Sequence, residues 1–256
     1  MHDLPRERAR AFARAQLAEL VWLDRDGRPA AAVVVPFQVE GGPLVALTYD
    51  RSALARELAA SPRIALVTAT ALFLRGAAPA GVVGRPVLEE DPSGRWFREQ
   101  LLEQELAKYP PARRLADSLL LQRENWWYLP CLIVRFDDAQ VLEHLTAAGA
   151  VAAVAGPDGL AVADGELDDR GDDARLGGAR LSDGPAVVLE HGGEVPELEV
   201  RWHRKLRGEL VDGRLEVHER DEVPPRHGRH GLVSRLRQQR RLQRGCLAEL
   251  RAAGHA

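Results

Sequence analysis

Short apolar runs separated by glycine-containing turns make up the first half of the chain. The run 31–39 is rich in β-branched residues and ends at Gly41-Gly42, and a second apolar run follows at 43–48. Two such runs joined by a short glycine-containing connection are typical of a β-hairpin. The pattern therefore predicts a hairpin over 31–48.

A helix-forming run at 53–60 follows this hairpin. Ser52 stands where a helix N-cap is expected, because its hydroxyl can accept hydrogen bonds from the amides of the first turn. Pro62 ends the helix, since the residue before a proline is pushed out of the α region. The next strand is predicted at 64–69.

The flanking segments extend this pattern into an antiparallel meander, which suits the wall of a β-barrel. Helical spacing of apolar residues near the N-terminus predicts an amphipathic helix. Further strands are predicted at 20–23, 82–88 and 131–136, and helices at 3–20, about 91–108 and 112–123.

The second half of the chain shows weak similarity to the first. Residues 180–217 resemble residues 58–91, since both contain a turn with proline, a Val/Leu strand, a polar connection and a second strand. This similarity predicts a degenerate repeat, and common β patterning explains it equally well. The acidic segment 163–173 is predicted to be a loop, and a domain boundary is placed near 143–150.

The C-terminal segment 226–251 is strongly basic, with eight arginines and a single acid, Glu249. A narrow stripe of leucines predicts a basic amphipathic helix. Three roles fit this helix: a solvated face against the acidic segment 163–173, cations for a phosphorylated or polyanionic cofactor, or nucleic-acid binding without base specificity.

Composition excludes several classes of protein. The 256 residues carry a net charge of −3, so the whole molecule is not an obvious nucleic-acid binder. Cys131 and Cys246 lie far apart, and no Cys/His cluster has the spacing of a metal site, so no metal is expected. With no signal core and no run of about 20 apolar residues, the expected location is the cytoplasm, away from membranes.

Four side chains at the end of the predicted hairpin are candidates for holding an anion. Thr48, Arg51, Ser52 and Arg56 place hydroxyls and guanidiniums beside the start of a helix, where a phosphate is favoured. The alternative is an ordinary helix cap with two surface arginines.

The same region carries a loose motif formed by Pro36, Phe37, Thr48, Ser52, Leu58, Pro62, Arg63 and Leu66. With this motif the chain resembles, over roughly residues 10–145, the FMN-binding split barrel of the pyridoxamine 5'-phosphate oxidase-like superfamily. Leu54 stands where relatives have a basic residue that helps to hold the cofactor phosphate, so the chain resembles a divergent member. Arg51 and Arg56 could substitute for that residue.

The resemblance implies a fold that is mostly β with flanking helices (α+β). A split barrel at 1–145 would precede a second, smaller domain at 150–256, which carries the basic helix and for which the internal similarity suggests a degenerate barrel repeat. In such proteins two barrels pair around the cofactor, which implies a homodimer or an intramolecular pseudo-dimer.

The resemblance also implies a function and a site. The chain would be a flavoprotein oxidoreductase that uses FMN, or alternatively a deazaflavin, on a small organic substrate. The implied cofactor-binding residues are Val34, Val35, Pro36, Thr48, Arg51, Ser52 and Arg56, and the substrate-binding residues are Lys108, Tyr109 and Trp127.

Two other functions stay open. The first is a non-catalytic cofactor- or haem-binding protein on the same fold, with His144 as the histidine nearest the barrel. The second is a polyanion-binding protein that acts through the arginine-rich tail. No catalytic acid or base can be named, because flavin chemistry belongs to the cofactor.

Overall fold

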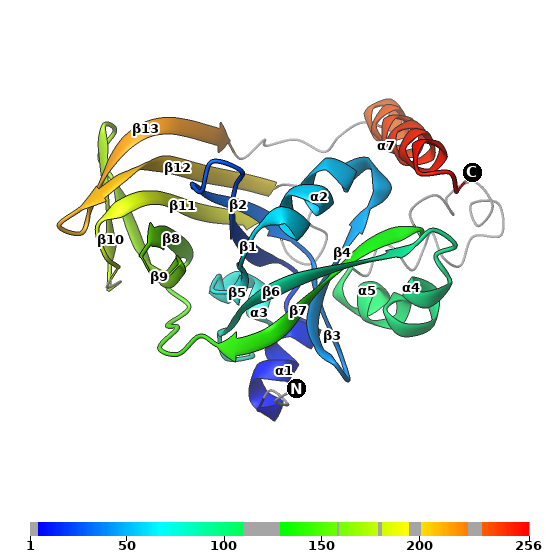
Figure 1. The fold of residues 1–256 in the computed structure, drawn as a ribbon, viewed down its shortest axis with the longest axis horizontal. Helices are drawn as coiled ribbons and strands as arrows, with labels where there is room; N and C mark the ends of the chain where they lie inside the picture. The colour runs from blue at the N-terminus through cyan, green and yellow to red at the C-terminus, as the bar shows by residue number, and fades with distance from the viewer. Residues whose placement is uncertain are drawn as a thin grey trace.

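The computed structural model describes residues 5–109, 129–157, 159–178, 181–194, 201–224 and 232–255. The helix predicted at 112–123 and the aromatic residue Trp127 lie outside these ranges. Within them, the predicted fold class is confirmed: the chain is mostly β with flanking helices, a split barrel followed by a second domain (Figure 1).

Seven antiparallel strands form the first sheet, in the order β2-β1-β5-β6-β7-β4-β3. β2 and β3 lie at opposite ends of this order, although Val35 alone separates them in the chain. The predicted strand 31–39 is therefore broken at Val35, and the sheet curls so that its two edges meet there. The strands are β1 (Ala18–Leu23), β2 (Pro29–Val34), β3 (Pro36–Val39), β4 (Gly42–Thr48), β5 (Ile64–Thr68), β6 (Ala80–Asp91) and β7 (Cys131–Val141).

Helices cover the edges of this barrel, and the predicted helix 53–60 is confirmed as part of α2. The N-terminal helix is shorter than the predicted 3–20, because Ala15 leaves the helical conformation ahead of β1. The helices are α1 (Arg6–Arg14), the 3₁₀ turn η1 (Tyr49–Arg51), α2 (Ser52–Ala60), α3 (Ala71–Leu74), α4 (Arg95–Gln100), α5 (Leu102–Lys108) and α7 (Leu232–Ala252).

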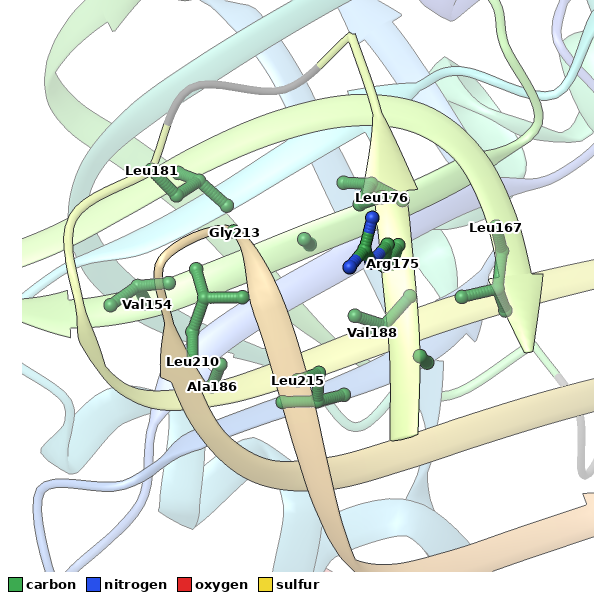
Figure 2. Close-up of a pocket in the computed structure, with 12 residues that line it drawn as sticks. Val154, Leu167, Arg175, Leu176, Leu181, Ala186, Val188, Leu210, Gly213 and Leu215 are labelled. Carbon is green, nitrogen blue, oxygen red and sulfur yellow. The ribbon is translucent and has the colours of Figure 1, made fainter. Parts of the chain in front are cut away.

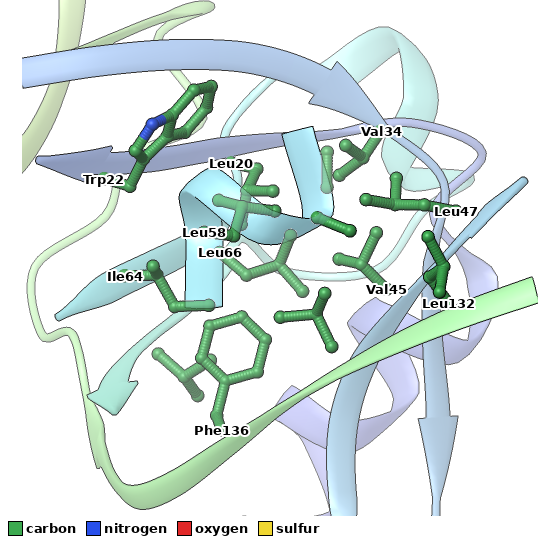
Figure 3. Close-up of a cluster of buried hydrophobic side chains, with 14 of the residues drawn as sticks. Leu20, Trp22, Val34, Val45, Leu47, Leu58, Ile64, Leu66, Leu132 and Phe136 are labelled. Atoms are coloured by element: carbon green, nitrogen blue, oxygen red, sulfur yellow. The ribbon is translucent and has the colours of Figure 1, made fainter. Parts of the chain in front are cut away.

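The core of the first barrel comes from alternate positions along its strands, because successive side chains of a strand point to opposite faces. Ile64 and Leu66 of β5 face this core, and Leu58 of α2 fills it from one side (Figure 3). The intervening residues Ala65 and Val67 are also buried. Ala65 packs in a cluster with Val187 of the second unit, and Val67 packs in a cluster with Val151. Residues 64–67 of β5 are apolar on both faces because the second unit covers the outer face of the strand, and the hydroxyl of its last residue, Thr68, donates to the Ala80 carbonyl.

Six strands form a closed barrel in the second unit, in the order β10-β13-β12-β11-β8-β9. The acidic segment 163–173 was predicted to be a loop, and this is wrong, because it lies in β9 and β10. Asp169 pairs there with Arg220 and Arg204, and such cross-strand ion pairs make an acidic strand tolerable. The strands are β8 (Ala150–Gly156), β9 (Gly159–Asp169), β10 (Asp173–Gly177), β11 (Gly184–Gly193), β12 (Arg201–Val211) and β13 (Arg214–Val223).

The two units share one connectivity. In the first unit β1 pairs with β2 and β5, and the pairing continues as β5–β6, β6–β7, β7–β4 and β4–β3. In the second unit β8 pairs with β9 and β11, and the pairing continues in the same way as β11–β12, β12–β13, β13–β10 and β10–β9. β9 is the unbroken counterpart of β2 and β3, since it pairs with β8 through its first half and with β10 through its second. The predicted similarity of 58–91 to 180–217 falls on equivalent pairs, β5–β6 and β11–β12.

The two units meet through β1 and β2 on one side and β8 and β11 on the other. Ala31 and Val21 pack there with Val187 and Leu189 in one apolar cluster. The helix α7 returns to the first unit and lies against η1, not against the acidic segment 163–173, so that interpretation of the tail is wrong. Among the described helices none is long and apolar enough to cross a membrane.

Candidate functional site

The helix that carries the candidate anion site begins earlier than the sequence predicts. η1 and α2 are continuous, and Thr48, in an extended conformation, precedes the first turn. The amide of Ser52 donates to the Tyr49 carbonyl, and Ser52 lies within the helix instead of capping it. Its hydroxyl is therefore free to serve a partner outside the helix.

That partner is the carboxylate of Glu249 on α7. The Ser52 hydroxyl donates to Glu249 Oε2 at 2.5 Å. One turn along α2, an Arg56 guanidinium nitrogen donates to Ser52 Oγ at 3.2 Å and lies 3.8 Å from the same Oε2. Two of the four predicted phosphate-binding side chains thus already hold an oxyanion, and it belongs to the chain itself.

A third predicted residue, Thr48, contacts Asp50. Thr48 Oγ1 donates to Asp50 Oδ1 at 2.5 Å, and the thiol of Cys246 donates to the same oxygen at 3.4 Å. For the fourth residue, Arg51, burial lowers the pKa of the guanidinium and the charge of Asp50 opposes that shift. The structure therefore joins Ser52 and Arg56 at Glu249 and places Thr48 at a second carboxylate, that of Asp50.

A cavity of about 140 Å³ opens beside Ser52 and Arg56, with Leu132, Glu90 and Tyr49 among its lining residues. Tyr49 donates to Glu90 Oε2 at 3.2 Å, and burial, with help from Glu90, raises the pKa of this phenol. The tyrosine is therefore a protonated donor at neutral pH.

The residues predicted to lie along a flavin ring are on the kinked strand β2–β3. Val34 is buried in the main core, whereas Val35 is half-buried beside Tyr109 in a cluster with Phe73. Pro36 offers its carbonyl to the ammonium of Lys108. The outer edge of β2 is outside the sheet's pairing, since β2 pairs with β1 alone.

Lys108, a predicted substrate-binding residue, is 2% exposed. Its ammonium donates to the carbonyls of Phe12, at 2.7 Å, and Pro36, and lies 5.0 Å from the ring centroid of Phe37. Burial lowers its pKa to about 7. This geometry connects α1, β3 and α5 and leaves no free face for a substrate. Trp127, the third predicted substrate contact, is outside the described residues.

Two groups at or near these sites were not found from the sequence. In the sequence, Glu249 stands out only as the single acid of a basic tail. This isolation among arginines is the feature that could have marked it as a site residue. The other is a buried pair between the units: His191 Nε2 lies 2.7 Å from Glu19 Oε1, and the imidazole stacks on Phe73. Its signal was a histidine inside the apolar run of β11.

Two other cavities are lined by residues that the structure describes. The interior of the second barrel is filled by apolar side chains such as Val188 and Leu215, and its cavity of about 20 Å³ holds about one water (Figure 2). A larger cleft of about 350 Å³ lies between the units near Arg28, but its charges include the internal pair Arg207–Glu219 at 3.6 Å.

Comparisons with known proteins give low similarities. No family model matches the chain, and no curated protein matches it. Among solved structures, it is similar to a haem-binding protein from Mycobacterium smegmatis, with 16% identity over 97% of this chain and 99% of that one and a TM-score of 0.34. A pyridoxamine 5'-phosphate oxidase-related, FMN-binding protein from Nostoc punctiforme shows 14% identity over 88% and 100%, with a TM-score of 0.30.

A third structure, of a protein of unknown function from Agrobacterium tumefaciens, shows 20% identity with a TM-score of 0.34. The match covers 54% of this chain and spans only 56% of that protein. These neighbours include FMN-binding and haem-binding proteins. Likenesses this low do not establish a function for this chain.

Proposed function

We propose that the first barrel binds FMN and that Ser52 and Arg56 receive the phosphate. The observation that supports this is the oxyanion already held there: a hydroxyl donates to it at 2.5 Å and a guanidinium lies within 3.8 Å. Carboxylates and phosphates are recognised by the same charged and hydroxyl donors. The residues at the phosphate end therefore fit the group.

The ring would lie along the outer edge of β2, at Val34 and Val35, where main-chain groups are outside the sheet's pairing. The Pro36 carbonyl is already engaged by Lys108, so it is the least available of the three predicted residues. Bound flavin would supply hydride chemistry, and the protein would supply orientation and electrostatics. A deazaflavin, which presents a similar ring and phosphate, fits the same proposal.

We further propose that the second barrel takes the place of a partner subunit. Its strands repeat the connectivity of the first, and its β8 and β11 cover β1 and β2 beside the proposed ring position. The chain would thus be an intramolecular pseudo-dimer that acts on a small organic substrate as an oxidoreductase. The non-catalytic alternative shares the binding step and lacks turnover.

The test is a titration with FMN and with riboflavin, which lacks the phosphate, followed by flavin absorbance and fluorescence up to about 1 mM. We expect FMN to bind at least about tenfold more tightly than riboflavin, because hydrogen bonds to a charged group contribute about 1.5–3 kcal/mol. Arg56→Gln should remove most of this difference. Arg25→Gln, in the exposed turn between β1 and β2, is the matched control.

Two results would contradict the proposal: no binding of either flavin to any form of the protein, or equal binding of FMN and riboflavin. If FMN binds, a second measurement separates an oxidoreductase from a binding protein. The bound flavin is reduced, and its reoxidation by small organic acceptors is followed.

A further inference from the structure

The last turns of α7 and the residues just after it contact the first barrel at several points. Cys246 and Leu250 are buried in the core of the first barrel. At Gly245 the helix passes so close to η1 that an added Cβ would lie 3.2 Å from Asp50 Cβ. Just after the helix, His255 Nε2 lies 3.0 Å from Glu90 Oε2 at the cavity. This end of α7 is therefore built to fit the site.

Glu249 points toward the first barrel, although it belongs to an arginine-rich helix. Residues three and four positions apart are neighbours on a helix, and none of those around Glu249 is basic: they are Gly245, Cys246, Ala252 and Ala253. The positive partner of the carboxylate is instead Arg56 of α2. The arginines of α7 described as exposed lie elsewhere on it, at 237, 240, 241, 244 and 251.

We propose that α7 is a built-in competitor for the phosphate site, with the Glu249 carboxylate in the place of a ligand's phosphate. This inference rests on the proposed function and concerns the regulation of that site. The Ser52 hydroxyl has one proton and donates to one oxyanion at a time, and two anions held against the same Arg56 guanidinium repel each other. Ligand binding and the docked position of α7 therefore exclude each other.

The contact between Arg56 and Glu249 is one that a ligand can break. The Arg56 and Glu249 side chains are 65% and 38% exposed, so solvent screens their attraction and a phosphate of higher charge can displace the carboxylate. Among the side chains described on α7, only Cys246 and Leu250 are buried. A ligand would thus move a helix that is attached through one face of its last turns.

The test uses the full chain and compares Glu249→Gln with Glu103→Gln, an exposed acid on α5. The probes are FMN, riboflavin and pyrophosphate. Glutamine keeps the size of the side chain and removes its charge. We expect Glu249→Gln to bind FMN and pyrophosphate at least about tenfold more tightly than the wild type, the size of one charge-assisted contact. Riboflavin binding should stay unchanged.

A second readout follows the helix itself. Saturating pyrophosphate should increase hydrogen exchange of the α7 amides in the wild type, and Arg56→Gln should abolish this effect. Leu250→Asp, which places a charge in the apolar contact, should release α7 and strengthen pyrophosphate binding like Glu249→Gln. Circular dichroism melts establish that each variant is folded.

The outcomes separate the two proposals. Tighter pyrophosphate binding by Glu249→Gln without any flavin binding supports the competitor and contradicts FMN as the ligand. Phosphate-dependent FMN binding that is equal, within twofold, in Glu249→Gln, Glu103→Gln and the wild type overturns the competitor alone. Failure of every probe to bind any variant overturns both.

Discussion

The buried ammonium of Lys108 makes the stability of the first barrel depend on pH in an unusual direction. Burial lowers its pKa from 10.5 to about 7 in the folded protein. Between these values the unfolded chain binds more protons than the folded one, so stability rises with pH. The neutral amine keeps two N–H groups, enough to serve both Phe12 and Pro36.

The magnitude follows from the size of the shift. Each pKa unit corresponds to about 1.4 kcal/mol, so the full shift from 10.5 to about 7 corresponds to about 5 kcal/mol, which is reached only when the pH range extends beyond both values. Allowing for half-protonation at pH 7, the gain between pH 7 and 9 is about 2 kcal/mol. This change is large against a typical total stability of about 5–15 kcal/mol.

The measurement is urea unfolding of the wild type and Lys108→Met at pH 7 and pH 9, with the difference taken between the two proteins so that other titrating groups cancel. We expect the wild type to gain about 2 kcal/mol more than the variant over this range. Lys205→Met, which removes the only other lysine, is the control for lysine loss. Equal pH dependence, within about 0.5 kcal/mol, in the wild type and Lys108→Met would refute the reasoning.

Two further substitutions test the packing of the units. Gly208→Ala should destabilise the second barrel by about 3 kcal/mol or more, because the new Cβ would meet the Glu216 carbonyl at a bulge of β12. The measurement is a thermal melt, and an unchanged melting temperature would contradict this prediction. Glu19→Ala removes the hydrogen-bond acceptor of the buried His191, so we expect a loss of about 3 kcal/mol in chemical unfolding, against no more than about 0.5 for the exposed Glu40→Ala. Equal effects of these two glutamate substitutions would exclude a structural role for the pair.

Some of the architecture was accessible from local pattern alone. The hairpin of β3 and β4, the helix α2 and the strand β5 follow from apolar runs bounded by Gly41-Gly42 and Pro62, whereas residues 31–34 of the predicted hairpin belong to β2, which pairs with β1. These signals operate over a few residues, so they need no knowledge of the rest of the fold. The same local spacing brought Ser52 and Arg56 together, one turn apart on one helix.

Other features depended on partners distant in the chain. Composition predicts a loop for the acidic segment 163–173, but residues 163–169 belong to β9, where Asp169 pairs with Arg204 of β12 and Arg220 of β13. The break at Val35 reflects the curl of a whole sheet, which no local pattern of β-branched residues specifies.

By itself, then, the sequence determined most of the strands of the first barrel and the spacing that places Ser52 and Arg56 one turn apart on one helix. Only the tertiary structure decided what they contact: Glu249, nearly 200 positions beyond Ser52, closes the site, and Glu19 joins the two units through His191. The physical reason is that propensity and periodicity are properties of neighbouring residues, whereas a buried or shared charge is assigned its partner by the packing of the whole chain.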